Sequence, residues 1–448
     1  MKRREFLHSV GAGSALSLWP RQLTWPAAID ADRMSWWREA RFGMFVHFGL
    51  YSTLGGEWKG KETGSHEWIR NNARIPHDEY IPLIHSFNPT RLDVDALVRM
   101  AKDAGQKYIV VTTKHHEGFS LFDSAVTTYD VMGTPYHRDI MRDFARACRR
   151  HGLRLGWYYS IMDWYHPDYL PRRDWELRSS TGADFTRYLT FMRAQLHELL
   201  TRYGDIAVMW FDGQWEPTWN HALGQSTYDY CRTLQPQVIV NNRVDVKVEG
   251  GTDTFQGSGR AGDFSTPELE VPATGLPGVD WESCMTMNHN WGYSKFDHDF
   301  KSVRQLVGLL VETASKGGNL LLNVGPMGDG AIPAESVNGL RGVGDWMRVN
   351  SSSIYGTTVT PFSHASFRVT QKGNRLHVFA EPWPGGEFEL KGLRDLPRSV
   401  TLLADPTAGS WPARRTADGV AITLPDRAPG DTYPVVVLDF DTPPAVAP

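Results

Sequence analysis

A strand that ends in an acid is the first feature of this sequence that could do chemistry. In "VMWFDG", residues 208–213, side chains alternate between two faces, so Val208, Trp210 and Asp212 share one of them. That face is apolar at first and then presents an indole and a carboxylate. A carboxylate held on a rigid strand end beside an aromatic ring is a candidate nucleophile.

Polar and aromatic side chains also follow the neighbouring predicted strands. A single histidine at a strand end is usually a hydrogen-bonded core residue, but a run of such ends is harder to explain in that way. In a parallel barrel the carboxyl ends of the strands and the loops beyond them build the active site. The candidates at these ends are His47, His115, His116, Glu117, Tyr158, Tyr159, Asn241, Asn242 and Arg243.

These residue types disfavour two common chemistries. His115 and His116 are adjacent, so they point to opposite sides of an extended segment, and the sequence contains no H-x-H or HExxH spacing. We therefore expect no metal and no other cofactor. A serine hydrolase would need a GxSxG elbow, which is absent. Neutral histidines, aromatic rings and an arginine around a carboxylate suit a ligand with several hydroxyls and apolar faces, such as a sugar.

Glycoside hydrolysis requires a second carboxyl group. In the retaining reaction one carboxylate attacks the anomeric carbon and the other, about 5–5.5 Å away, protonates the leaving oxygen. The candidates for this acid are Glu268 and Glu270 in "GDFSTPELE" and Glu282 in "DWESC". We favour Glu268 because it lies on a predicted loop, whereas Glu282 comes early in a predicted strand.

The elements that must position these residues alternate between strands and helices from about residue 32 to 350. Near-continuous apolar strands followed by amphipathic helices are typical of a parallel sheet. Eight strand candidates predict a (β/α)8-like barrel, with an open doubly wound sheet as the less favoured alternative because no GxGxxG follows the first strand. The predicted strands are 42–49, 107–113, 153–160, 205–212, 238–243, 254–258, 281–287 and 319–325.

The pattern changes after Ser351. Short runs of alternating apolar residues are separated by Gly, Pro, Asp and Asn, as in "RLHVFAEPW", "GVAITLP" and "TYPVVVLDF". Such runs predict antiparallel strands, so we expect a C-terminal β-sandwich over 356–443 that packs on the barrel.

Composition limits the range of partners. The 448-residue chain has a formal net charge of −4, without a block of like charges, which makes nucleic acid an unexpected partner. No stretch reaches the roughly 18 apolar residues of a membrane span. Cys148, Cys231 and Cys284 show no metal or disulfide spacing and are interpreted as buried small hydrophobes. The sequence makes no prediction of oligomeric state.

The N-terminus predicts export. In "MKRREFLHSVGAGSALSLWP" the pair Arg3-Arg4 precedes a mildly apolar run of small residues. This pattern is typical of a twin-arginine signal, which delivers a folded protein across the bacterial inner membrane. We therefore expect a signal peptide over residues 1–28 and a periplasmic or secreted protein.

The motifs together resemble the α-L-fucosidases of glycoside hydrolase family 29. The resemblance covers about residues 34–350 and keeps its order. It rests on "RFGMFVHFGLYS", "TTKHHEGFSLFDS", "GWYYSIMDW", "MWFDG", "GDFSTPE" and "SKGGNLLLNVGPMGDGAIP". The resemblance implies a retaining exo-hydrolase with a barrel-like catalytic domain, a β-rich C-terminal domain and no metal.

The resemblance also implies roles for individual residues. Asp212 matches the nucleophile, and Glu268 is expected to be the acid/base, with Glu282 as the alternative. The residues that match substrate-binding positions are His47, Glu67, Trp68, His115, His116, Tyr158, Trp210, Arg243 and Trp291. Trp291 falls where an aromatic ring faces the methyl group of fucose, which prefers an apolar wall.

The sequence "GDFSTPE…VPATGLPGVDWESCMTMNHNWGY" resembles the branch of this family that prefers α-1,3/1,4-linked fucose on branched acceptors. The substrate is therefore expected to be a fucosylated oligosaccharide or glycoconjugate. Three alternatives remain at this stage: a broad-specificity α-L-fucosidase, a hydrolase of a related sugar such as L-galactose, and a non-catalytic fucose-binding protein. The last would predict a lost nucleophile, yet Asp212 is present.

Overall fold

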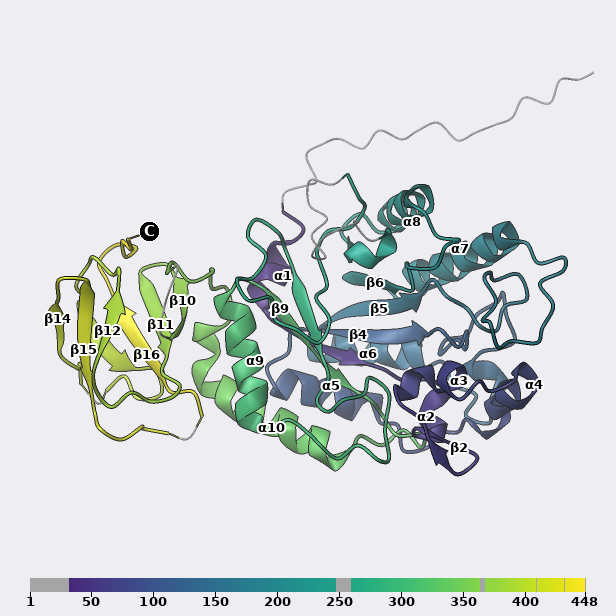
Figure 1. The fold of residues 1–448 in the computed structure, drawn as a ribbon, viewed down its shortest axis with the longest axis horizontal. Helices are drawn as coiled ribbons and strands as arrows, with labels where there is room; N and C mark the ends of the chain where they lie inside the picture. The colour runs from purple at the N-terminus through teal and green to yellow at the C-terminus, as the bar shows by residue number, and fades with distance from the viewer. Residues whose placement is uncertain (1–31, 247–258, 363–366, 408, 431, 448) are drawn as a thin grey trace, which may run out of the picture. The chain divides into compact units, whose positions relative to one another are not determined.

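Seven parallel strands form the main sheet, in the order β7-β6-β5-β4-β1-β9-β8 (Figure 1). The computed structural model describes residues 32–246, 259–362, 367–407, 409–430 and 432–447. The strands are β1 (Phe42–Val46), β4 (Tyr108–Lys114), β5 (Arg154–Ser160), β6 (Val208–Asp212), β7 (Ile239–Val240), β8 (Glu282–Met285) and β9 (Asn319–Val324). Nearly every strand residue is buried, as expected for a parallel sheet covered on both faces.

An irregular segment joins the two edges of this sheet and closes it into a barrel. It lies between β7 and β8 and forms parallel bridges on both sides, which pair Asn241 with Phe264, Ser265 with Trp281, and Glu268 with Cys284. The predicted (β/α)8-like barrel is thus confirmed. Residues 264–268 take the place of the remaining strand, between β7 and β8. The strand predicted at 254–258 lies outside the described residues.

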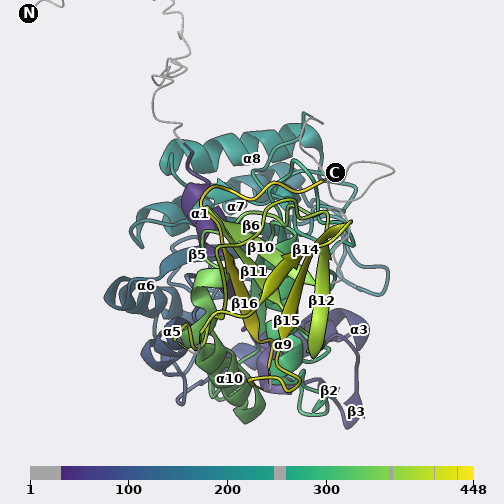
Figure 2. The same ribbon diagram turned by 90° about the vertical axis from the view of Figure 1, so that its left-hand side faces the viewer.

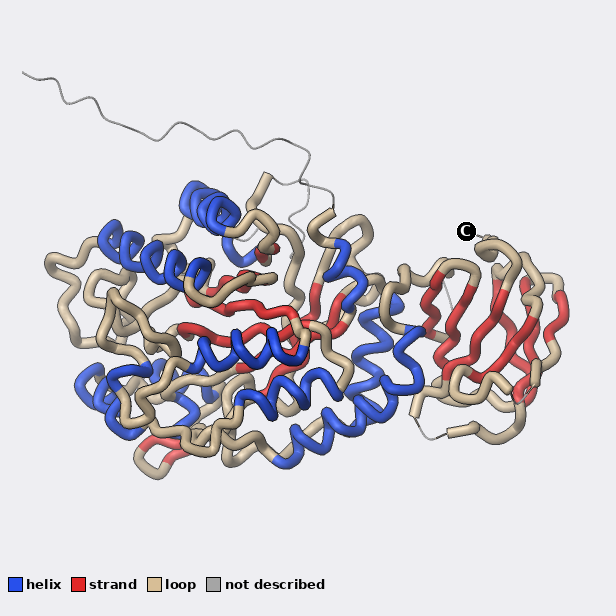
Figure 3. The backbone as a smooth tube through the Cα atoms, turned by 180° about the vertical axis from the view of Figure 1, so that it is seen from behind, coloured by secondary structure: helices blue, strands red, loops and turns tan. Residues whose placement is uncertain are grey.

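Helices pack around the barrel, as Figure 3 shows in blue around the red strands. The longer ones are α5 (Val94–Asp103), α6 (Ile140–His151), α7 (Phe185–Thr201), α8 (His221–Leu234), α9 (Val303–Ser315) and α10 (Ala334–Asn350). Most begin where a side chain accepts a hydrogen bond from a free backbone N–H; Ser302 and Gln305 form a complete capping box before α9.

The sequence pattern did not predict α10. Its three glycines lower the intrinsic helix propensity, but they permit close packing. A Cβ on Gly344 would lie 2.4 Å from the carbonyl oxygen of Asp103 in α5, and one on Gly342 would lie 2.4 Å from Val303 in α9. Close helix contact therefore stabilises a segment whose local signal is weak.

Shorter elements lie before β1 and in the long connection between β1 and β4. They are α1 (Ser35–Ala40), α2 (Tyr51–Leu54), β2 (Glu57–Trp58), β3 (Lys61–Glu62), α3 (Ile69–Asn72) and α4 (His77–Tyr80). In Figure 1 the β4 arrow points toward the side of the barrel on which α2, α3 and α4 lie. The β1–β4 connection thus supplies walls for the carboxyl end of the barrel.

Two antiparallel sheets make up the C-terminal region and face each other in Figure 2. One contains β10 (Arg368–Lys372), β11 (Arg375–Phe379), β16 (Val435–Asp439) and β13 (Ser399–Leu402); the other contains β12 (Gly386–Lys391), β15 (Gly419–Leu424) and β14 (Ala413–Arg415). Apolar side chains of both sheets share one core, so the predicted sandwich is confirmed. The boundaries 32–350 and 356–443 stay predictions, and residues 1–28 lie outside the described residues.

Candidate active site

Two carboxylates at the carboxyl end of the barrel share one guanidinium. Arg243 donates through Nη1 to Oδ1 of Asp212 (3.0 Å) and through Nη2 to Oε2 of Glu268 (2.7 Å). Asp212 is the last residue of β6, and Glu268 ends the segment that closes the barrel. The structure therefore places the expected nucleophile and the expected acid/base on either side of the same cation.

Arg243 is held in place on several sides. Its Nε donates to Oγ1 of Thr266 (3.0 Å), and its guanidinium lies over the Trp210 ring, 4.9 Å from the ring centroid. Burial alone would lower the pKa of Arg243, but Asp212 and Glu268 outweigh it and raise the pKa above its usual value. The arginine is therefore a permanent cation that compensates two carboxylates.

The second oxygen of Asp212 faces a tyrosine and a histidine. Tyr158 donates its hydroxyl proton to Oδ2 (2.9 Å), and Nε2 of His116 lies 3.5 Å from the same atom. Nδ1 of His116 donates to Oγ of Ser160 (2.6 Å), because that hydroxyl itself donates to the carbonyl oxygen of Met162. Nε2 therefore faces the site as a hydrogen-bond acceptor, suited to a substrate hydroxyl.

Asn323 orients a second histidine and a tryptophan. Its Oδ1 lies 2.7 Å from Nδ1 of His47, while its Nδ2 donates to the carbonyl oxygen of Trp291 (2.7 Å). The Trp291 ring lies 5.1 Å from the His47 ring, and its indole N–H donates to Oε1 of Glu268 (3.2 Å). Trp291 thus links the histidine side of the site to the second carboxylate.

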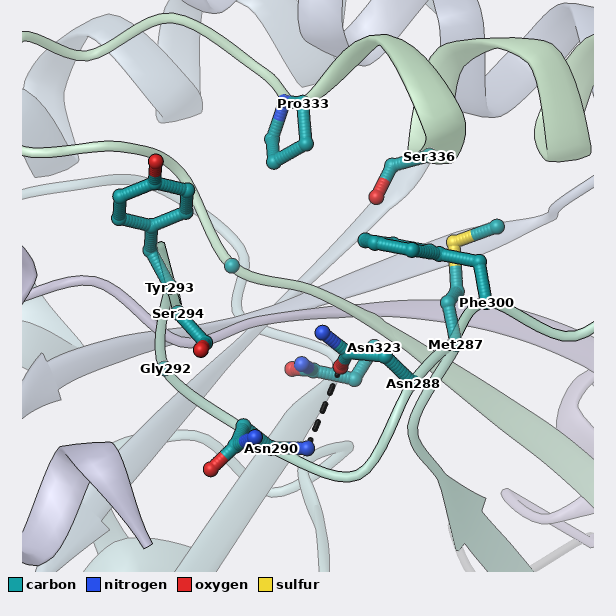
Figure 4. A pocket seen from close by; sticks show the side chains of 11 residues that line it. Met287, Asn288, Asn290, Gly292, Tyr293, Ser294, Phe300, Asn323, Pro333 and Ser336 are labelled. Atoms are coloured by element: carbon teal, nitrogen blue, oxygen red, sulfur yellow. Dashed lines mark hydrogen bonds between the residues drawn. The ribbon is translucent and has the colours of Figure 1, made fainter. Parts of the chain in front are cut away.

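Asn323 is also among the residues that line a small cavity (Figure 4). Its volume is about 20 Å³, and Asn288, Asn290 and Ser336 are among its polar lining residues. That volume accommodates about one water molecule and excludes a sugar ring. The cavity is lined by Gly292 and Asn323, next to Trp291, and is not the substrate site.

The three histidines are neutral in the folded protein. Burial lowers the pKa of His47 to about 4 and lowers the pKa values of His115 and His116 well below the usual value. For His115 the positive charge of Lys114 adds to this effect, and its ring stacks on Tyr158 at 5.4 Å. A neutral imidazole offers one donor and one acceptor, which matches sugar hydroxyls.

The short helical turn 66–68 adds an acid and an indole to the same end of the barrel. Oε2 of Glu67 accepts from the backbone N–H of Gly292 (3.1 Å), and burial raises the pKa of Glu67. Trp68 packs edge-on against His116, with ring centroids 5.0 Å apart. Both residues therefore border the site.

Trp210 packs beneath Arg243 inside the barrel. Its ring is 2% exposed and stacks on Tyr158 at 5.6 Å inside the barrel. One face supports the Arg243 guanidinium, while the indole nitrogen is directed toward Glu282. Trp210 thus positions Arg243 from below.

Glu282 lies at the amino end of the barrel, away from the other candidates. It is the first residue of β8, and its Oε2 accepts from Tyr108, the first residue of β4, and from Trp37 in α1 (3.3 Å for Trp37). It is fully buried, and burial raises its pKa to about 7. Such a carboxyl group cannot reach a substrate at the opposite end of the strands.

Sequence reasoning missed several residues of this site. Asn323 and Ser160 each orient a histidine, yet the strand patterns of 153–160 and 319–325 single out neither residue. Trp164 and Trp215 pack beside His116, with ring centroids 5.6 and 6.0 Å away. The available signal was the same in each case: a polar or aromatic residue at, or just after, a strand's carboxyl end.

Two further properties concern the part of the chain that the structure describes. There, no three His, Cys, Asp or Glu side chains form a group that could hold a metal ion. Within the same residues, no helix has the length and apolar character needed to cross a bilayer.

Comparison with known proteins identifies the family. A model of the α-L-fucosidase family matches residues 20–352. The chain belongs to the α-L-fucosidase family. It is therefore a glycoside hydrolase, and fucosylated glycans are the substrates that this family implies.

Similar proteins cover nearly the whole chain. The α-L-fucosidase isoenzyme 1 of Paenibacillus thiaminolyticus is 38% identical, with a TM-score of 0.81 over 93% of this chain and 99% of that one. A GH29 α-L-fucosidase of Bacteroides thetaiotaomicron, solved as a trapped covalent intermediate with 2-fluoro-fucosyl fluoride, is 31% identical, with a TM-score of 0.81 over 91% and 95% of the two chains. The plasma α-L-fucosidase of Rattus norvegicus is 32% identical over 92% of this chain and 91% of its own length.

Proposed function

We propose that this α-L-fucosidase is an exo-acting, retaining enzyme that removes terminal α-linked L-fucose, with Asp212 as nucleophile and Glu268 as acid/base. The observation that carries the proposal is the Arg243 bridge, which holds both carboxylates at the carboxyl end of the barrel. The relative from Bacteroides thetaiotaomicron, trapped as a covalent intermediate, supports a two-step reaction.

In the first step an oxygen of Asp212 attacks the anomeric carbon while Glu268 donates its proton to the leaving oxygen. The products are a covalent fucosyl–Asp212 ester and the free alcohol of the acceptor. In the second step Glu268 removes a proton from water, which attacks the same carbon and releases fucose. Tyr158 and Arg243 stabilise Asp212 as a carboxylate before attack and after release.

Fucose binding follows from the residues around the carboxylates. The neutral rings of His47, His115 and His116 hydrogen-bond the sugar hydroxyls. The half-buried Trp291 provides an apolar wall for the methyl group at C6. An additional hydroxyl at C6, as in L-galactose, would lose hydration against this wall.

The preferred linkages are α-1,3 and α-1,4 on branched acceptors, an inference that rests on the sequence of residues 262–293.

The chain is exported through its twin-arginine signal and acts in the periplasm or outside the cell. Export is tested by fractionating cells that produce the wild type or the double substitution of Arg3 and Arg4 by lysine. Retention of the double variant in the cytoplasm supports export, and an unchanged distribution contradicts it.

The central experiment measures free fucose released from a Lewis-type trisaccharide and from an aryl α-L-fucoside by the wild type and by Asp212→Gly. Release from the trisaccharide alone, lost in the variant, supports both the nucleophile and the linkage preference. Equal release from the aryl fucoside contradicts the linkage preference but keeps the mechanism. Undiminished release by Asp212→Gly contradicts the role of Asp212.

A further inference from the structure

Trp215 is an exposed indole within an otherwise buried segment. It follows Asp212 by three residues and is 42% exposed, whereas Gly213, Gln214 and Glu216 are buried. Among the tryptophans that the structure describes, the others are buried or half-buried. A large apolar ring that stays in water beside a catalytic carboxylate suggests a ligand contact.

The ring lies close to the reacting groups. Its centroid is 6.0 Å from that of His116, whose Nε2 is 3.5 Å from Oδ2 of Asp212. On one side it stacks on Trp68, with ring centroids 6.3 Å apart and an interplanar angle of 21°. Trp68 stacks on one face and His116 packs edge-on, yet 42% of Trp215 remains exposed.

The surroundings hold this ring in place without covering it. The Arg173 guanidinium lies over the rings of Trp68 and Trp164, 5.5 and 5.3 Å from their centroids. Arg173 also forms an ion pair at 3.1 Å with Glu216, the residue next to Trp215. A preorganised aromatic surface loses little conformational entropy when a ligand binds.

We propose that the outer face of Trp215 is the stacking platform for the sugar that leaves, and so determines which acceptors the enzyme accepts. This inference rests on the proposed function. When fucose lies between Asp212 and Trp291, its glycosidic oxygen is directed toward Glu268 and the mouth of the barrel. The next ring along the glycan then reaches Trp215. The ligand is a pyranose that presents C–H bonds on one face, because such a face is apolar like the indole.

The test compares two substrates whose leaving groups differ in having a ring: a fucosylated trisaccharide and α-L-fucosyl fluoride. We expect Trp215→Ala to raise KM for the trisaccharide about tenfold more than KM for the fluoride, from the loss of one stacking contact. Trp215→Phe, which keeps an aromatic ring, recovers most of this difference. As a control, Leu396→Ala removes a 40% exposed apolar side chain from the C-terminal region and leaves both KM values unchanged.

Other outcomes overturn the proposal. Equal losses on both substrates would mean that Trp215 only supports Trp68 and His116. Unchanged kinetics on the trisaccharide would mean that the ring contacts no acceptor. A wild-type enzyme that hydrolyses neither substrate refutes the proposed function itself, and this failure is recognised before any variant is made.

Discussion

The two ends of the barrel both hold carboxyl groups among aromatic rings, but only one end can do chemistry. At the carboxyl end, Asp212 and Glu268 share the Arg243 cation, and Glu268 is partly exposed. At the amino end, Glu282 is sealed by Tyr108 and Trp37, and among the residues that the structure describes it forms no ion pair. Trp210 lies between the two ends, with its face under Arg243 and its indole nitrogen toward Glu282.

The difference shows what separates a catalytic carboxyl from a structural one. Without a cation, burial raises the pKa of Glu282 to about 7, so the group is largely protonated below neutral pH and serves as a neutral hydrogen-bonding residue. At the mouth, by contrast, the buried Arg243 guanidinium forms ion pairs with both Asp212 and Glu268. Residue type is the same at both ends, and the partner and the access decide the role.

The largest effect is expected from exchanging the two glutamates for glutamine one at a time. Glu268→Gln should lower kcat for the trisaccharide about 1,000-fold, because the leaving oxygen loses its proton donor. It should affect the first step on fucosyl fluoride far less, since fluoride needs little acid assistance, so fluoride release in the first turnover should stay fast while the second step, which needs Glu268 as base, slows. Glu282→Gln should retain most of the activity on both substrates. Initial rates on the two substrates measure this contrast, and comparable losses in both variants would abolish the distinction between the two ends.

The next largest effect is expected from replacing the guanidinium that Asp212 and Glu268 share. Arg243→Lys keeps the charge but cannot reach both carboxylates with a planar fork, so kcat/KM should fall about 100-fold. Initial rates on the trisaccharide measure this loss. A kcat/KM equal to that of the wild type would show that the shared guanidinium is not required.

At the amino end of the barrel, Glu282 is expected to affect the free energy of unfolding rather than the activity. The pKa of Glu282 is raised by burial from 4.5 to about 7, so between these pH values the folded protein binds a proton that the unfolded chain has lost. The free energy of unfolding therefore falls as pH rises through this window, by up to about 3 kcal/mol for this group. Glu282→Gln should lack that contribution.

Denaturant unfolding of the wild type and Glu282→Gln at pH 5 and pH 8 measures the difference. Glu117 has a pKa raised by burial to about 7 as well, but it is present in both proteins and cancels. Parallel pH dependence in the two proteins would show that Glu282 is already ionised in the folded state.

The smallest effect concerns backbone strain beside Glu268. Leu269 has a φ of 56°, in the left-handed region, and its side chain is 53% exposed. Leu269→Gly should raise the free energy of unfolding by about 0.5–1 kcal/mol, because relief of the strain exceeds the added freedom of the unfolded chain. Leu396→Gly, at an exposed leucine outside the left-handed region, should lower it. Thermal unfolding of both variants distinguishes them, and destabilisation by Leu269→Gly would contradict the strain.

The sequence predicted most of the site because most of its residues follow strands with clear period-two patterns. His47, Tyr158 and Asp212 come at or just after the ends of buried strands, and the structure brings them together. Glu268 was expected on a loop, whereas it ends the segment that closes the barrel. That segment contains Pro267, follows Gly262 and has no regular alternation, so only its backbone bonds to β7 and β8 reveal its position.

The tryptophans mark a second limit of sequence reasoning. Trp210 and Trp215 both lie near Asp212 in the sequence, yet one is buried beneath Arg243 and the other is exposed at the mouth. Asn323 was likewise indistinguishable from a structural residue until its two hydrogen bonds were seen. Contacts between segments far apart in the chain decide these roles.

The sequence by itself determined the alternation of strands and helices, the antiparallel C-terminal sheets and the acid at the end of β6, because periodicity and strand ends are local properties of the chain. Tertiary structure alone decided which carboxyl group joins Asp212, which ring meets solvent and which acid stays neutral. The physical reason is that charge compensation, burial and hydrogen bonding depend on neighbours that the closure of the barrel brings together.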